Sequence, residues 1–293
     1  MPRRFTVLDP RLVSALDAGA LVVTPNNRLA RDIVSRYDAL KRAQGLRAWP
    51  SARAMPRQAW LRSLWLDLVA RAPGATPPVL LEGAASLHLW QSIVAADTAE
   101  LLDARGAARQ ASDAWALFHA WRAPGEALRS RVARIDEDGD AFLRWAGRYA
   151  RRLQALHAID DAQVAEALTL RAQDMVAPEC AIVLYGFSDW EPAQLRLLSA
   201  LRANAWKLDE YSPGAVPAQR LGRIVFATPE EEMQQALSWA RDHALRDGQA
   251  RIGIVFEDLQ RRRDALLGLA EEILCPERLA DAQADATRPY GIS

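Results

Sequence analysis

The hydrophobic and polar positions change their period along the chain. A short apolar run from Leu21 to Thr24 predicts a buried strand, and a helical pattern follows from about Asn27 to Gln44, where Gly45 is suited to end the helix. From about Pro56 to Asp174 apolar residues recur at helical spacing, as in Leu61, Leu64, Trp65 and Leu68. This part predicts a strand, a helix and then a long helical tract.

Beyond the helical tract, apolar runs alternate again with helical patterns. The expected elements are a strand in Cys180–Phe187, a helix opened by Glu191 and Pro192, a strand in "RIVFATP", a helix from Glu230 to Arg246, a strand in "RIGIVFED", and a helix from about Gln260 to Leu274. Strands that alternate with helices are typical of a parallel sheet. We therefore expect an α/β fold in which the helical tract, about residues 56–176, is a large insertion.

Composition limits the classes of protein that remain. The chain has 293 residues and 50% apolar content, enough for a sizeable core. Its longest apolar runs are too short to span a bilayer and no signal-peptide pattern follows the start, so we expect a cytoplasmic protein without membrane contact. Two cysteines and four scattered histidines predict neither disulfide nor metal site, and we expect no cofactor.

Basic residues are concentrated near the first predicted helix, although the whole chain is balanced with 37 basic and 37 acidic residues. Nine basic residues lie between Asn26 and Arg62: Arg28, Arg31, Arg36, Lys41, Arg42, Arg47, Arg53, Arg57 and Arg62. Asp32 and Asp38 are the two acids in that span. The region is a candidate polyanion-binding face, or alternatively a solvated helix surface.

The turn between the first strand and helix is the most informative stretch. Thr24, Pro25, Asn26 and Asn27 place hydroxyl, amide and backbone N–H donors at a helix N-terminus, where α/β proteins often bind anionic ligands. The ten tryptophans could stack on unpaired bases, but most of those in helical patterns are better explained as core residues.

The order of these parts resembles the motor core of UvrD-type superfamily 1 helicases. The segment "TPNNRLARDI" is similar to the helicase segment T-F-T-N-K-A-A-R-E-M, which in that family contacts the phosphate backbone of single-stranded DNA. Hydroxyl, amide and guanidinium donors suit phosphate oxygens. The residues that this resemblance implies for DNA binding are Thr24, Asn26, Asn27, Arg28 and Arg31, with Arg263 of a second domain as an additional candidate.

The nucleotide motifs of those helicases are missing. A phosphate-binding loop needs a lysine after glycine, and the two lysines, Lys41 and Lys207, do not follow glycine. Tyr185 and Gly186 stand where the helicases have the Asp-Glu pair that holds magnesium, while Phe187, Asp189 and Gln194 keep the surrounding pattern. Asp189 is expected to cap the following helix. The sequence predicts no ATP hydrolysis.

A closer resemblance is to a family of bacterial probable DNA repair proteins related to the AddAB helicase-nuclease B subunit and to RecC. It is carried by "VVTPNNRLAR", "WPSARAMPRQAWLRSLW", "LYGFSDWEPAQLRLLSAL", "FATPEEEMQQALSWAR" and "IGIVFEDLQRRRDALL". This resemblance implies a P-loop-NTPase-like (RecA-like) first domain, residues 1–208, and the start of a second RecA-like domain, residues 209–293. Members often carry a C-terminal nuclease, and we expect this chain to be a piece of such a longer protein.

The resulting hypothesis is a non-motor, DNA-binding part of a repair helicase-nuclease. Its expected partners are single-stranded or frayed DNA and a helicase-nuclease subunit. Two alternatives remain: an assembly module whose basic helix docks on an acidic partner, and an unrelated α/β enzyme with a small-molecule site at the Thr24–Asn27 turn. A compact polar pocket at the strand ends would favour the enzyme, whereas an open basic groove would favour DNA.

Overall fold

The computed structural model describes residues 8–71, 77–97, 101–122, 127–128, 137–212, 221–248, 250, 252–280 and 289–292. The chain divides into two compact units, Met1–Ala215 and Val216–Ser293. The domain boundary expected at 208/209 falls inside a strand of the first unit. Each unit is described by itself below.

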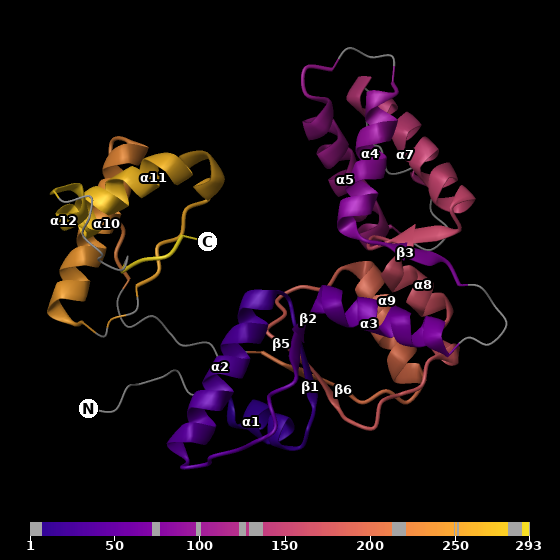
Figure 1. The fold of residues 1–293 in the computed structure, drawn as a ribbon, viewed down its shortest axis with the longest axis horizontal. Helices are drawn as coiled ribbons and strands as arrows, with labels where there is room; N and C mark the ends of the chain where they lie inside the picture. The colour runs from indigo at the N-terminus through magenta and orange to yellow at the C-terminus, as the bar shows by residue number, and fades with distance from the viewer. Residues whose placement is uncertain are drawn as a thin grey trace. The chain divides into compact units, whose positions relative to one another are not determined.

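The first unit contains most of the regular structure (Figure 1). Its elements are α1 (Pro10–Asp17), β1 (Leu21–Thr24), α2 (Asn27–Ala43), β2 (Ala54–Pro56), α3 (Arg57–Ala70), β3 (Val79–Leu81), α4 (Gly83–Ala95), α5 (Ala104–Trp121), α7 (Glu137–Ala155), β4 (Ala158–Asp160), α8 (Val164–Leu170), a short 3-10 helix (Ala172–Asp174), β5 (Ile182–Tyr185), α9 (Pro192–Ala203) and β6 (Leu208–Tyr211). The predicted strand Leu21–Thr24, the helix that follows it and the strand near residues 182–185 are confirmed.

Four parallel strands form the main sheet in the order β2-β1-β5-β6. The chain moves outward from β1 to β2 at one edge and outward from β5 to β6 at the other. The two central strands, β1 and β5, pair with Val23 opposite Leu184. Because their connections leave in opposite directions, the carboxyl ends of β1 and β5 form the topological switch point, where open α/β sheets bind their ligands.

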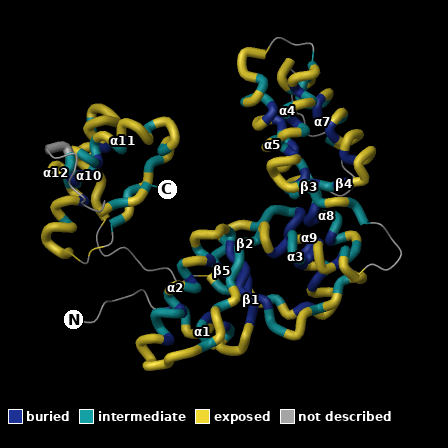
Figure 2. The backbone as a smooth tube through the Cα atoms, viewed as in Figure 1, coloured by how far each residue is buried: buried dark blue, intermediate teal, exposed yellow. Residues whose placement is uncertain are grey.

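Helices cover both faces of this sheet because successive side chains of a strand point to opposite faces (Figure 1). Val22 and Val183 face α1 and α2, where they pack with Leu12 and Ile33. On the opposite face α3, α8 and α9 cover the sheet. The buried residues of that face are Leu21, Val23, Trp60, Leu64, Trp65, Leu168, Ile182, Leu184, Leu197, Leu198 and Leu201. Figure 2 shows the central strands as the most buried part of the unit.

The expected helical insertion contains short strands as well as helices. β3 and β4 form a separate two-stranded parallel sheet, and α4, α5 and α7 pack around Trp90, Trp115, Trp145 and Tyr149. Trp90 and Tyr149 stack with their ring centroids 4.2 Å apart. The described residues of the expected tract are mostly helical, but the short strands β2, β3 and β4 were not predicted, and α3 and α8 belong to the main sheet's cover.

The second unit consists of α10 (Pro229–Arg246), α11 (Leu259–Leu274) and α12 (Pro276–Ala280) around a core of Met233, Leu237, Leu266 and Ala270. The strands expected in "RIVFATP" and "RIGIVFED" are not formed among the described residues. Ile254 and Phe256 pack toward the helices while Val255 is 94% exposed, so the alternation is that of a strand. The prediction failed because a strand also needs a hydrogen-bonded neighbour, and no such ladder is present in the described part of this unit.

Candidate nucleic-acid interface

The turn after β1 is built on Thr24, which is fully buried. Its Oγ1 donates to the carbonyl oxygen of Asn26 at 2.9 Å and lies 3.3 Å from that of Met55 in β2. Thr24 was predicted to contact DNA, but the structure places its hydroxyl beneath the turn and away from solvent. Its side chain fixes the shape of the turn.

Asn26 is the N-cap of α2. Its backbone is extended, with φ −147°, and its Oδ1 accepts the backbone N–H of Leu29 at 2.9 Å. Asn27 and Arg28 follow on the exposed first turn, and their backbone N–H groups have no acceptor among the described residues. The first turn of α2 therefore presents free donors and the positive end of the helix dipole to solvent.

Arg28 and Arg31 extend this group of donors along α2. Both side chains are exposed, and neither has an ion-pair partner among the described residues. Arg36, on the same helix, instead pairs with Asp32 at 2.8 Å. Lys41 is buried and its Nζ lies 2.6 Å from Asp17. Asn26, Asn27, Arg28 and Arg31 thus come together at one exposed helix end, as predicted from the turn.

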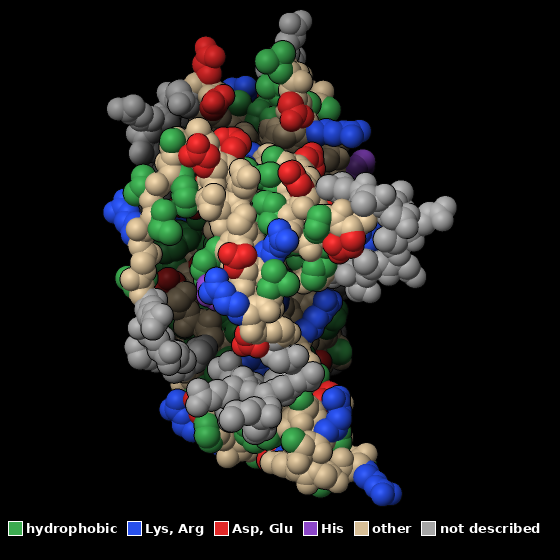
Figure 3. Space-filling model, turned by 90° about the vertical axis from the view of Figure 1, so that its left-hand side faces the viewer, with side chains coloured by type: hydrophobic (Ala, Val, Ile, Leu, Met, Phe, Trp, Pro, Cys, Tyr) green, Lys and Arg blue, Asp and Glu red, His purple; other side chains and the backbone are tan. Residues whose placement is uncertain are grey.

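The wider basic face expected between Asn26 and Arg62 is smaller than its sequence suggests. Arg36, Lys41, Arg57 and Arg62 are each paired with an acid. On the face that Figure 3 shows, basic and acidic side chains of the described residues are intermixed. The free positive charge of this region is therefore carried by a few arginines on and just after α2.

A shallow groove of about 350 Å³ runs beside α2. It is lined by Asn27, Ala30, Arg31, Val34, Ser35, Asp38, Arg42 and Ala54. Asp38 in this groove accepts the indole N–H of Trp49 at 2.7 Å. The groove is open and is lined by both polar and apolar side chains, which differs from the enclosed pocket that the small-molecule alternative requires.

Gly186 holds the exit of β5 against the first turn of α2. Its φ is +79°, and a Cβ atom at this position would lie 2.6 Å from Cδ2 of Leu29. Glycine is required here both for the left-handed backbone and for the close approach. The contact joins the two strand ends of the switch point.

We expect Gly186→Ala to destabilise the first unit more than Gly45→Ala. Gly45 ends α2 with nearly the same φ, +80°, but nothing lies within 4 Å of its missing Cβ. Both variants incur the left-handed backbone cost of roughly 1–2 kcal/mol, and Gly186→Ala adds a steric clash with Leu29. Urea denaturation of both variants measures the difference, and equal losses would show that the contact with Leu29 has no energetic role.

A second polar group, which the sequence did not predict as a unit, joins the starts of α3 and α9. Arg57 Nη1 donates to Gln194 Oε1 at 2.7 Å, and its Nη2 lies 3.5 Å from Glu191 Oε1. Gln194 is buried and also donates through Nε2 to Glu191 Oε2. α9 begins after Glu191 without a side-chain cap, so the expected capping role of Asp189 was wrong. In the sequence, Gln194 was noted only for its place in the resemblance to the helicases.

Arg263 lies on α11 of the second unit. It is exposed and has no ion-pair partner among the residues described there. The structure therefore groups Asn26, Asn27, Arg28 and Arg31 at one turn and leaves Arg263 in a separate body.

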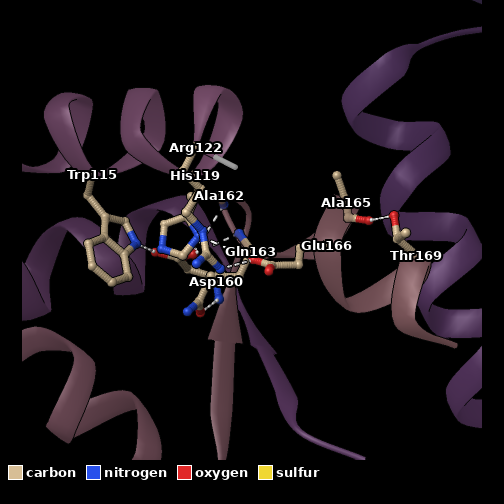
Figure 4. A network of polar contacts seen from close by, with 9 residues as sticks. All are labelled: Trp115, His119, Arg122, Asp160, Ala162, Gln163, Ala165, Glu166 and Thr169. Atoms are coloured by element: carbon tan, nitrogen blue, oxygen red, sulfur yellow. Dashed lines mark hydrogen bonds and ion pairs between the residues drawn. The ribbon is translucent and has the colours of Figure 1, made fainter. Parts of the chain in front are cut away.

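The helical part of the first unit contains a buried polar cluster centred on Asp160 (Figure 4). Its carboxylate accepts Trp115 Nε1 at 3.0 Å and the Tyr149 hydroxyl at 2.9 Å, together with the backbone N–H groups of Ala162 at 3.1 Å and Gln163 at 3.3 Å. Burial raises the pKa of Asp160, and these hydrogen bonds act in the opposite direction. The cluster joins α5, α7 and β4 and has a structural role.

His119 lies beside this cluster and is buried. Its Nδ1 is 3.8 Å from Glu166 Oε2, and Arg122 donates to that same oxygen. Neither ring nitrogen has a hydrogen-bond partner among the described residues. Burial, aided by the charge of Arg122, lowers the pKa of His119 to about 4. The imidazole is therefore neutral in the folded protein at neutral pH.

We expect the first unit to lose stability as the pH falls from about 6.5 to about 4. In the unfolded chain His119 takes up a proton near pH 6.5, but in the folded protein only near pH 4, so acid favours the unfolded state in this window. The full difference is roughly 3 kcal/mol. His119→Leu should remove this part of the pH dependence in urea titrations, whereas His88→Gln, on the exposed side of α4, should leave it unchanged.

The fold and the site together define an α/β protein that exposes a basic helix N-terminus at the switch point of a parallel sheet. Comparison with models of known protein families gave no match, and comparison with curated proteins gave none either. In the described residues no helix is long and apolar enough to cross a membrane, and no group of three potential metal-ligating side chains is found.

Proposed function

We propose that this chain is a non-motor, DNA-binding part of a helicase-nuclease type protein in DNA repair or recombination. The observation that carries the proposal is the first turn of α2 at the switch point, where Arg28 and Arg31 are exposed. Among the described residues neither has an ion-pair partner, and the neighbouring backbone N–H groups have no acceptor. These donors match the phosphate oxygens of a single DNA strand. The open groove beside α2 leaves room for a polymer.

A RecA-like ancestry of the first unit is part of this proposal. Its four parallel strands, with helices on both faces, are compatible with that fold. β5 ends in Tyr185 and Gly186, which have no carboxylate to hold magnesium. Lys41 is buried against Asp17 and follows no glycine, so it is unsuited to bind nucleotide phosphates. These features support a scaffold that binds DNA without hydrolysing ATP.

The test is fluorescence anisotropy of a labelled single-stranded oligonucleotide with the wild-type chain over a range of NaCl concentrations. We expect the logarithm of the binding constant to fall linearly with the logarithm of salt, by roughly 0.7 for each phosphate contact. Poly-glutamate as competitor addresses the assembly alternative. Binding of poly-glutamate without binding of the oligonucleotide would overturn the proposal and favour an acidic protein partner.

A further inference from the structure

We infer that Phe187 and Trp190 form a stacking platform for an unpaired base of the bound strand. The two rings lie in the loop between β5 and α9, almost parallel, with centroids 3.9 Å apart and an interplanar angle of 19°. The inference rests on the proposed function and extends it, because it specifies single-stranded nucleic acid as the ligand.

The pair is anchored in the core but is only partly buried. Both residues are half-buried and pack against the core between the sheet, α3 and α9. The indole N–H of Trp190 has no acceptor among the described residues, yet it is not among the buried unpaired atoms, unlike those of Trp60 and Trp206. It therefore reaches solvent.

The platform lies next to the phosphate-binding turn. Phe187 directly follows Gly186, whose backbone is in close contact with Leu29 in the first turn of α2. The ends of β1 and β5, which carry the turn and the platform, are neighbours in the sheet. The turn and the platform therefore lie at the same, carboxyl-terminal edge of the sheet.

The loop that carries the platform is fixed at its far end. Glu191 follows Trp190 directly. It accepts a hydrogen bond from Gln194 and forms an ion pair with Arg57. The loop is thus held at Gly186 on one side and at Glu191 on the other. Such preorganisation lowers the entropic cost of binding. We assign to Arg57 and Gln194 a positioning role for the platform.

Stacking on an aromatic surface is available to every base, but only when the base is unpaired and can leave its neighbours. The platform therefore predicts preference for single strands over duplex and little preference among sequences. The phosphate-binding turn alone would not discriminate in this way, because it contacts only the backbone.

The experiment compares Trp190→Leu with Trp190→Phe in anisotropy titrations. Leucine keeps an apolar side chain for the core, whereas phenylalanine also keeps an aromatic face. The probes are a labelled oligo-dT and an abasic oligonucleotide of the same length, which has the backbone without bases. Trp239→Leu, an exposed tryptophan on α10 of the second unit, is the matched control.

The wild-type chain should bind oligo-dT more tightly than the abasic strand. Trp190→Leu should weaken oligo-dT binding by roughly 5- to 150-fold, as expected for one lost stacking contact. Its affinity for the abasic strand and its salt slope should be unchanged. Trp190→Phe should retain most of the affinity, and Trp239→Leu all of it.

The outcomes separate this inference from the proposed function. Equal binding of both strands by the wild type, or equal weakening of both by Trp190→Leu, would overturn the platform and leave the phosphate-binding turn intact. Failure of the wild type to bind either strand would overturn the proposed function and the platform with it. Near-UV circular dichroism and thermal melting establish that each variant is folded before it is titrated.

Discussion

Arg28→Ala combined with Arg31→Ala is expected to weaken single-stranded DNA binding by roughly 30- to 150-fold, since two exposed hydrogen bonds of roughly 1–1.5 kcal/mol each are lost. Both side chains are exposed and have no ion-pair partner in the described part of the chain. The log-log salt slope should become shallower by about 1.4, because two phosphate contacts are lost. Anisotropy titrations at several salt concentrations measure both quantities.

Arg36→Ala is the matched control for this variant. Arg36 lies on the same helix, and its substitution also removes one positive charge. Its Nε, however, is already paired with Asp32 at 2.8 Å. We expect little change in DNA affinity or salt slope. If Arg36→Ala weakens binding as much as the loss of Arg28 or Arg31, binding depends on overall charge and the turn is not the site.

Asp160→Ala should destabilise the first unit by roughly 2–6 kcal/mol, because two buried donors lose their acceptor and each one left unsatisfied costs roughly 1–3 kcal/mol. The variant leaves the Trp115 indole N–H and the backbone N–H of Ala162 without an acceptor, while the backbone N–H of Gln163 keeps the carbonyl oxygen of residue 160 at 3.0 Å. Tyr149 retains its hydrogen bond with Ser86 at 2.7 Å. Domains are stable by only about 5–15 kcal/mol, so this loss is large.

The neighbouring residue provides the comparison. Asp161 forms a partly exposed ion pair with Arg62, and solvent screening limits its value to roughly 1 kcal/mol or less. Asp161→Asn should therefore be nearly neutral, and Asp160→Asn, which keeps one acceptor oxygen, should lie between the two extremes. Urea denaturation followed by near-UV circular dichroism reports on the first unit, which holds nine of the ten tryptophans. Equal effects of Asp160→Asn and Asp161→Asn would show that the buried network contributes little.

Local sequence signals were sufficient to predict elements whose ends are fixed by residues only a few positions apart. The strand Leu21–Thr24 is a short apolar run, and the helix after it has an N-cap in Asn26 and ends at Gly45, whose N–H bonds Arg42 O at 3.0 Å. The following residue, Leu46, bonds Lys41 O at 3.2 Å, which completes a Schellman motif. These features depend on residues within a few positions of one another, so they can be read before the fold is known.

The short strands could not be predicted in this way. β2, β3 and β4 have three residues each, too few to show a period, and they exist because a neighbouring strand offers hydrogen bonds. The reverse occurs in the second unit, where residues 252–256 alternate as a strand should but form no ladder. Pairing between segments that are distant in sequence decides both cases.

The sequence by itself determined the α/β character, the polar turn at the start of α2 and the absence of a phosphate-loop lysine. Only the tertiary structure decided which basic residues are free, because Asp17, Asp161 and Glu191 come from distant segments to neutralise Lys41, Arg62 and Arg57. It also buried the Thr24 hydroxyl and stacked the Phe187 and Trp190 rings against the core formed with α3 and α9. The charge and the hydrogen-bond donors of a side chain follow from its residue type. Whether they are free to bind a ligand depends on the residues that folding places next to them.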